Sequence, residues 1–219
     1  MVYTDQQGAQ MKEEFLGLLR QVERPGMDNL IEWLETKTDF FVAPASSKFH
    51  GCFKYGLVRH SLNVYYAALK LMDMARELGL QEKNIDQTVP LQSLTLCCLL
   101  HDVCKINQYK ETVKFFKDDT NSWQKYISYE IEKQIPLGHG SASCAILQTM
   151  IQLNMNELAA IMWHMGMTDI GLMMSPYTKS DLMQSMNDIP LVQIVAQADY
   201  FASFMMEKEI DQKVVNRII

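Results

Sequence analysis

The stretch LTLCCLLHDVCK, residues 94–105, carries the strongest structural signal in the chain. Its apolar run ends in an adjacent imidazole and carboxylate, His101 and Asp102. Burying a bare carboxylate costs several kcal/mol or more unless a cation or hydrogen-bond donors meet it. The stretch therefore predicts a buried helix that carries half of a metal site, and the rest of the chain has to supply the other ligands or hydrogen-bond partners.

Length and composition indicate one acidic domain. At 219 residues the chain fits one domain with a core large enough to hold a polar site. With 20 Lys and Arg against 26 Asp and Glu, the net charge is -6, which does not favour a surface for long nucleic acid. The five cysteines are odd in number and lack a C-x-x-C spacing, which predicts reduced thiols. We expect a cytoplasmic protein without a membrane partner, because the N-terminus is polar and no apolar run approaches the roughly 20 residues of a membrane span.

Hydrophobic spacing predicts a mostly α fold. Helical spacing recurs in residues 57–78, in the run that follows Pro90, in residues 141–153 and 156–165, and in the run that follows Pro190. Residues 109–129 instead interleave apolar and charged side chains about a turn-rich centre, which predicts a β-hairpin. We therefore expect a single helical bundle, residues 44–219, with a small hairpin insertion, and a helical appendage, residues 1–43, that packs on it.

Histidine and aspartate residues recur in an order typical of a metal site. The chain has five histidines: His50, His60, His101, His139 and His164. With Asp102 and Asp199, the last four give the pattern H…HD…H…H…D, which puts the ligands on separate helices or at helix ends. Helical bundles assemble metal sites from such facing elements. Imidazole and carboxylate without thiolate suit Fe, Mn, Ni, Co or Mg more than structural zinc.

The chain resembles the HD-domain metal-dependent phosphohydrolase superfamily, most closely its small stand-alone bacterial members, in the segments GLVRHSLNV, LLHDVCK, PLGHGSASC, AAIMWHMG and VAQADYFAS and in their order. This resemblance covers roughly residues 44–207. It implies one ion bound by His60, His101, Asp102 and Asp199, and a second ion that Asp102 shares with His139 and His164. It also implies that His50 contacts the substrate. Many relatives have Gly in place of Cys104, a difference expected to narrow the pocket without removing a ligand.

Two adjacent cations would supply hydrolytic chemistry at phosphorus. They would compensate the buried Asp102 and Asp199, lower the pKa of a shared water, and clamp the attacking and leaving oxygens of an in-line displacement. Lys105 follows His101 by four residues and shares its face if the helix continues, so its ammonium is expected to meet a phosphate oxygen. A solvated cation at a helix C-terminus is the alternative for Lys105. We assign catalysis to Asp102 and Lys105, and substrate binding to His50 and Lys105.

The leading hypothesis from the sequence is a metal-dependent phosphohydrolase that cleaves a phosphoester by attack of metal-activated hydroxide. Its partner would be a small phosphorylated molecule, namely a nucleotide, a cyclic dinucleotide or a short oligonucleotide. The alternatives are a di-iron oxygenase of the same fold, which needs iron and oxygen, and a non-catalytic nucleotide-binding module. The hairpin aromatics Phe115, Trp123 and Tyr126 would stack on a base or, as we expect, cover the helices beneath them.

Overall fold

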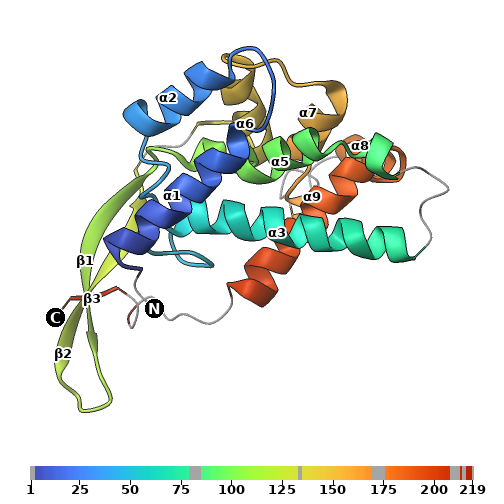
Figure 1. The fold of residues 1–219 in the computed structure, drawn as a ribbon. Coiled ribbons are helices and arrows are strands. Elements are labelled where there is room, and N and C mark those ends of the chain that lie inside the picture. The colour runs from blue at the N-terminus through green and yellow to red at the C-terminus, as the bar shows by residue number, and fades with distance from the viewer. Residues whose placement is uncertain are drawn as a thin grey trace.

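Helices α3 (Gly56–Glu77) and α5 (Leu91–Leu100) pack against each other, and helix α9 (Pro190–Phe201) contacts both (Figure 1). The computed structural model describes residues 3–78, 85–132, 135–168, 176–207, 213 and 216–218. In α5, the residues from Ser93 to Leu100 are all buried, so this helix has almost no solvated face. A helix that is apolar all round belongs in the centre of a fold. The predicted buried helix is therefore confirmed.

Further described helices surround this centre or flank it (Figure 1). They are α1 (Asp5–Leu19), α2 (Met27–Lys37), α4 (Ile85–Thr88), α6 (His139–Gln148), α7 (Met155–Met162) and α8 (Pro176–Asp188). Shorter turns are the 3-10 turns η2 (Val103–Lys105) and η3 (Gly166–Thr168) and the π turn η5 (Ala202–Met206). The mostly α fold predicted from the sequence is confirmed. Among the described residues, no single helix has the length and apolar composition of a membrane span. One pair of described helices, Tyr177–Asp188 and Pro190–Met206, has that length and composition when taken together, but the pair is bent by 104°.

Helix α1 contributes to the same apolar cluster as the central helices. It begins with a capping box, in which Gln7 N donates to Thr4 Oγ1 (3.2 Å) and Thr4 N donates to Gln7 Oε1 (2.9 Å). Its buried side chains Phe15, Leu16 and Leu19 join the cluster that α3 and α5 form. The N-terminal helix therefore stabilises the two helices that carry His60 and His101.

A buried ion pair connects the segment after α1 to helix α7. Arg24 donates from its two terminal nitrogens to the two carboxylate oxygens of Glu157, at 2.7 and 2.6 Å. Glu157 also accepts from Ser93 Oγ (2.7 Å) and from the backbone of Asn154 (2.9 Å). Burial raises the pKa of Glu157, but these donors outweigh it and hold the pKa below its usual value. This network fixes α7, the helix that leads to His164.

The predicted hairpin is confirmed. Strands β1 (Tyr109–Lys117) and β2 (Trp123–Ile131) pair antiparallel from Tyr109↔Ile131 to Lys117↔Trp123, and β3 (Arg217–Ile218) pairs with β2. In the turn, the Asp118 carboxylate accepts from the backbone N–H groups of Thr120 and Ser122, both at 3.0 Å. The hairpin extends away from the helices in Figure 1. Phe115 and Trp123 are 60% and 67% exposed, so the expectation that they cover the helices is wrong, because both lie close to the turn of the hairpin.

Two helix boundaries differ from the prediction and affect the site. Helix α5 ends at Leu100, and the chain continues into the 3-10 turn Val103–Lys105 instead of a further α turn. Lys105 is therefore not on a continuous α-helical face with His101. Helix α6 begins at His139, ahead of the expected start at residue 141, because polar and glycine residues at a first turn carry no apolar periodicity.

Candidate metal centre

The six predicted ligands come from separate elements that converge in the core. His60 lies in α3, His101 and Asp102 follow α5, His139 begins α6, His164 follows α7, and Asp199 lies in α9. The three histidines at 60, 101 and 164 are fully buried, and the two aspartates are 2% and 9% exposed. His139 is only partly buried. Charged and polar groups at this depth need hydrogen-bond or ionic partners, which these side chains can offer one another.

Two close backbone approaches allow this convergence. A Cβ on Gly56 would lie 1.9 Å from the carbonyl oxygen of Gly51, so only glycine lets α3 begin against that loop. A Cβ on Gly140 would lie 2.1 Å from the carbonyl oxygen of Met162. Glycine at position 140 therefore brings the first turn of α6, with His139, against the end of α7.

His60, His101 and Asp199 form a group whose atoms fit one ion. His60 Nε2 lies 3.2 Å from His101 Nε2 and 3.1 Å from Asp199 Oδ1. Two ligand atoms that are each about 2.1 Å from one ion lie about 3.0 Å apart at a right angle and about 3.4 Å apart at a tetrahedral angle. The two measured separations lie within this range.

The two carboxylate oxygens of Asp102 lie near different histidines. Its Oδ2 lies 3.4 Å from His101 Nε2 and 3.6 Å from His60 Nε2, and its Oδ1 lies 3.5 Å from His164 Nε2. Both Asp102 Oδ1 and His164 Nε2 are buried and have no hydrogen-bond partner among the described residues. Buried polar atoms without partners are rare and costly. A cation between these two atoms would satisfy both.

The outer nitrogens of three rings are held by acceptors. His101 Nδ1 donates to the carbonyl of Cys98 at 2.9 Å, and His164 Nδ1 donates to the carbonyl of Ile161 at 2.7 Å. His60 Nδ1 contacts the carboxylate of Glu207 at 3.1 and 3.3 Å. An acceptor at Nδ1 fixes one proton there, so an ion that displaces any proton from Nε2 would meet the Nε2 lone pair of each ring. This is the tautomer that a metal ligand requires.

The electrostatics of the cluster favour a cation. Burial lowers the pKa of His60, but Glu207 and Asp199 outweigh it and raise the pKa to about 10. Burial raises the pKa of Asp102, but Lys105 and His101 outweigh it and hold the pKa well below its usual value. The pKa of Asp199 is likewise lowered, because the contact with His60 outweighs burial. The carboxylates therefore stay charged and need positive charge beside them, which protons or metal ions can supply.

A comparison with protein-family models matches residues 57–203 of the chain to the HD domain, a family of metal-dependent phosphohydrolases in general. The chain belongs to the HD-domain family. A search of curated proteins and a search of solved structures found no match. The matched residues of this HD domain contain all six predicted ligands, whereas His50 and Glu207 lie outside them.

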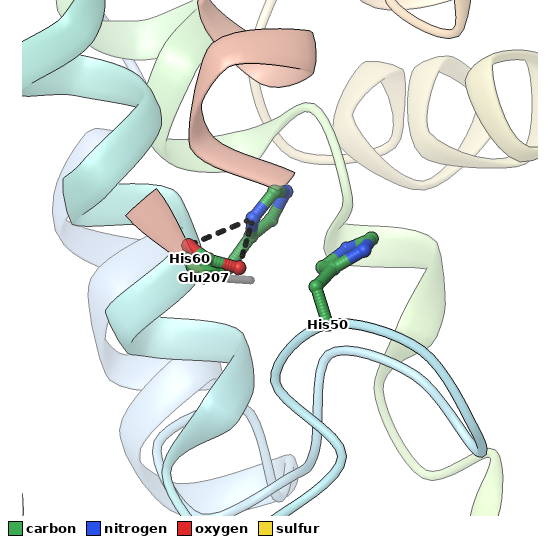
Figure 2. A group of neighbouring side chains, drawn as sticks. All are labelled: His50, His60 and Glu207. Atoms are coloured by element: carbon green, nitrogen blue, oxygen red, sulfur yellow. Dashed lines mark hydrogen bonds and ion pairs between the residues drawn. The ribbon is translucent and has the colours of Figure 1, made fainter. Parts of the chain in front are cut away.

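The sequence analysis missed Glu207, the carboxylate behind His60 (Figure 2). The side chain is 5% exposed and also accepts from Asn63 Nδ2 at 2.7 Å. Glu207 N donates to Ala202 O at 3.0 Å, which is the i→i+5 bond of the π turn. This wider turn lets the eight-residue separation between Asp199 and Glu207 span about two turns, so both carboxylates face His60. The i, i+4, i+8 spacing of Asp199, Ser203 and Glu207 was the available signal.

His50 lies on the loop that precedes α3 and faces His60 (Figure 2). The ring centroids are 4.8 Å apart, and His50 Nε2 is buried without a hydrogen-bond partner among the described residues. Burial, together with the positive charges of His60 and Lys105, lowers the pKa of His50 to about 4. His50 is therefore a neutral imidazole at the edge of this HD-domain site, and its contact with substrate stays a prediction.

Lys105 reaches the cluster by a different route from the one predicted. Its Nζ donates to Asp102 Oδ2 at 2.6 Å, and the residue is only 8% exposed. The 3-10 turn after α5 makes this contact, whereas an α-helical continuation was expected. Burial lowers the pKa of Lys105, but Asp102 outweighs it and raises the pKa above its usual value. The alternative of a solvated cation is wrong, since the ammonium is buried and paired.

His139 approaches Asp102 together with Cys104. The Cys104 Sγ lies 3.7 Å from His139 Nδ1, and ligand atoms of all three residues lie within 4.8 Å of one another. His164 instead groups with His101 and Asp102. None of the four groups of possible ligands found among the described residues contains both His139 and His164, although the resemblance implied that these two share an ion.

A cavity of about 770 Å³ opens beside the cluster. Asp199, Glu207 and His50 form part of its wall, and aromatic side chains form much of the remainder. These aromatic residues are Phe49, Phe53, Tyr200 and Phe204. The rings of Tyr200 and Phe204 stack with centroids 5.9 Å apart. The HD-domain cluster thus meets a space of the size and apolar character typical of small-molecule sites.

Proposed function

We propose that this chain is a metal-dependent phosphohydrolase that cleaves a phosphoester of a small, nucleotide-like substrate. The observation that carries the proposal is the pair of buried atoms Asp102 Oδ1 and His164 Nε2, which lack hydrogen-bond partners among the described residues. Leaving each such atom unpaired costs about 1–3 kcal/mol, whereas a shared cation would compensate both. Membership of the HD-domain family supports the same reading.

Different residues of the cluster would bind each of the two ions. His60, His101 and Asp199 would hold one ion, and Asp102 would bridge to a second beside His139 and His164. Imidazole and carboxylate ligands of this kind suit Fe, Mn, Ni, Co or Mg. Bound ions would supply Lewis-acid polarisation of the phosphoryl group and a water of lowered pKa. The acceptors at Nδ1 hold the rings in place, so little reorganisation is needed when an ion binds.

Lys105 and His50 are the groups that we expect to meet the substrate. When the oxygens of Asp102 turn to cations, the Lys105 ammonium loses its present partner at Oδ2 and is left to bind a phosphoryl oxygen. His50 is neutral, because burial and neighbouring cations lower its pKa to about 4. A neutral imidazole both donates and accepts, which suits a contact with a phosphate oxygen or the leaving group.

The cavity favours a substrate with a flat apolar part. Its aromatic wall, formed in part by Tyr200 and Phe204, would stack on a nucleobase, and Asp199 marks the end where the phosphoester would lie. The net charge of -6 opposes binding of a long polyanion. A nucleotide, a cyclic dinucleotide or a short oligonucleotide matches these features.

The test begins with the metal content of protein purified without chelator or affinity nickel, measured by mass spectrometry. Metal-free protein is then loaded with Fe, Mn, Ni, Co or Mg and assayed on bis-p-nitrophenyl phosphate and a panel of nucleotides. We expect turnover that is lost in His101→Ala and Asp102→Asn and retained in Asp86→Asn, whose exposed carboxylate pairs with Arg76. In Tyr200→Ala we expect KM for a nucleotide to rise about tenfold with a smaller change in kcat.

Two outcomes would replace this function with another. Folded, metal-loaded protein that binds nucleotides but hydrolyses none of the panel would indicate a non-catalytic binding module. Turnover that requires both iron and oxygen would indicate the di-iron oxygenase. Hydrolysis that proceeds without oxygen supports the phosphohydrolase.

A further inference from the structure

Cys104 lies where a second ion would be held, although no spacing in the sequence marks it as a ligand. The residue is 1% exposed, and its Sγ lies 3.7 Å from His139 Nδ1. Ligand atoms of Cys104, His139 and Asp102 all lie within 4.8 Å of one another. Three side chains that can bind a metal therefore lie close together. Asp102 and Cys104 come from the turn η2 and the residue before it, and His139 is the first residue of α6.

The separation between the sulfur and the nitrogen fits a shared ion. In a tetrahedral zinc site the sulfur is about 2.3 Å and the nitrogen about 2.0–2.1 Å from the metal, which puts the two atoms about 3.6 Å apart. The observed 3.7 Å agrees with this value. The position is also fixed by the backbone, because Cys104 N donates to Ser143 Oγ of α6 at 3.2 Å. This bond ties the turn that carries the thiol to the helix that carries His139.

The carboxylate of Asp102, whose Oδ1 also faces His164, supports an ion at this group. Lys105 already occupies its Oδ2, whereas its Oδ1 is buried and has no hydrogen-bond partner in the part of the chain that the structure describes. Other thiols behave differently: Cys97 donates to the carbonyl of Glu157 and Cys144 to that of Leu158, as structural cysteines do. Cys104 instead faces groups that bind metals.

We propose that Cys104 is a thiolate ligand of the second ion, together with Asp102 and His139. The inference rests on the metal centre of the proposed function but not on its substrate. On binding, the thiol gives its proton to solvent and a sulfur–metal bond forms. A soft thiolate shifts the preference of this position towards zinc, cobalt and iron and away from magnesium and manganese. The ion preferences expected from imidazole and carboxylate alone then hold only for the ion at His60, His101 and Asp199.

Cobalt(II) reports this bond directly, because a thiolate bound to it produces charge-transfer absorption in the near ultraviolet. Metal-free full-length protein is titrated with cobalt under a phosphine reductant, since added thiols would themselves bind the ion. We expect the band in the wild type and in Cys144→Ser, a matched control whose thiol lies on α6, and its loss in Cys104→Ser. We also expect Cys104→Ser to retain about one equivalent of zinc less per chain.

A band that is absent from the wild type, or that persists in Cys104→Ser, would overturn the proposal. X-ray absorption at the zinc edge of the wild type gives a test that needs no variant to fold: sulfur at about 2.3 Å supports the proposal, and a shell of nitrogen and oxygen alone overturns it. Both readouts are independent of turnover. Sulfur ligation in an inactive protein would refute the proposed reaction alone, and activity without sulfur ligation would refute the role of Cys104 alone.

Discussion

Replacing Glu207 by Gln tests whether the carboxylate behind His60 strengthens the metal centre. Glu207 contacts His60 Nδ1 at 3.1 Å and accepts from Asn63 Nδ2 at 2.7 Å, so both of its oxygens face donors. Glutamine keeps the shape of the side chain but has one acceptor oxygen and no charge. In Glu207→Gln an amide N–H group must therefore face one of the two donors, and the charge that makes His60 a stronger ligand is lost.

The expected loss follows from that one contact. A hydrogen bond to a charged group contributes about 1.5–3 kcal/mol, and removal of a partner behind a metal ligand typically costs 10–100-fold in metal affinity, which is about 1.4–2.7 kcal/mol. The pH matters because a proton competes with the ion for His60, whose pKa is raised to about 10. Without Glu207 this pKa falls, and the ion has less proton competition near neutrality. The deficit of the variant should therefore be smaller at pH 7 and widen as the pH rises towards about 9.

The measurement is a competition titration of metal-free protein against a chromophoric chelator at the two pH values. Asn63→Ala is the matched control, since it removes the other hydrogen bond and leaves the carboxylate on His60. Its loss of affinity should be smaller than that of Glu207→Gln. Wild-type affinity in Glu207→Gln at both pH values would refute the view that this carboxylate supports a metal ligand.

Three further predictions concern the elements that hold the centre in place. Arg24→Met leaves the buried Glu157 carboxylate without its cation and should lower the free energy of unfolding by about 3 kcal/mol, or Tm by roughly 6–12 °C. The control Lys12→Ala removes a surface pair with Glu35 and should lower the free energy of unfolding by under about 1 kcal/mol. The lowered pKa of Glu157 stabilises the fold above the unfolded value of 4.5, so denaturant titrations should show that this contribution is lost as the pH falls from there towards the folded pKa. Gly140→Ala would put a Cβ 2.1 Å from the carbonyl of Met162, and metal analysis should show weakened retention of the ion beside His139 in protein that remains folded by circular dichroism.

The helices and the buried positions of the candidate ligands could be predicted because each depends on local sequence. Helix α5 is buried on all sides, and a continuous apolar run is the local record of that burial. His60, His101 and Asp199 are polar residues in or directly after such buried helices, so each already stood out from its apolar neighbours. The hairpin was equally visible, since its alternation and the turn at Asp118 are properties of a few adjacent residues.

The missed features depend on contacts between elements or on irregular turns. Glu207 reaches His60 because a π turn changes the helical register, and apolar spacing does not announce such a turn. Lys105 contacts Asp102 because the chain leaves the α-helix after Leu100. Cys104 meets His139 across two elements, and no pattern within either element encodes that distance. Apart from the i, i+4, i+8 spacing of Asp199, Ser203 and Glu207, these relations depend on tertiary contacts that one sequence does not express.

In the proposed function, Asp102 would link metal binding to phosphate binding. In the described structure its Oδ2 accepts from the Lys105 ammonium, while its Oδ1 is without a hydrogen-bond partner among the described residues and faces His164. An ion that binds Oδ2 would weaken the hydrogen bond that this oxygen accepts from the ammonium, and a buried cation of this kind would then need a new anion. A phosphoryl group is that anion, since it lies beside the same carboxylate during the proposed reaction. If the proposed function holds, ions at the centre would free Lys105 for substrate, and substrate bound to Lys105 would stabilise the ions on Asp102, because such coupling between two ligands is reciprocal.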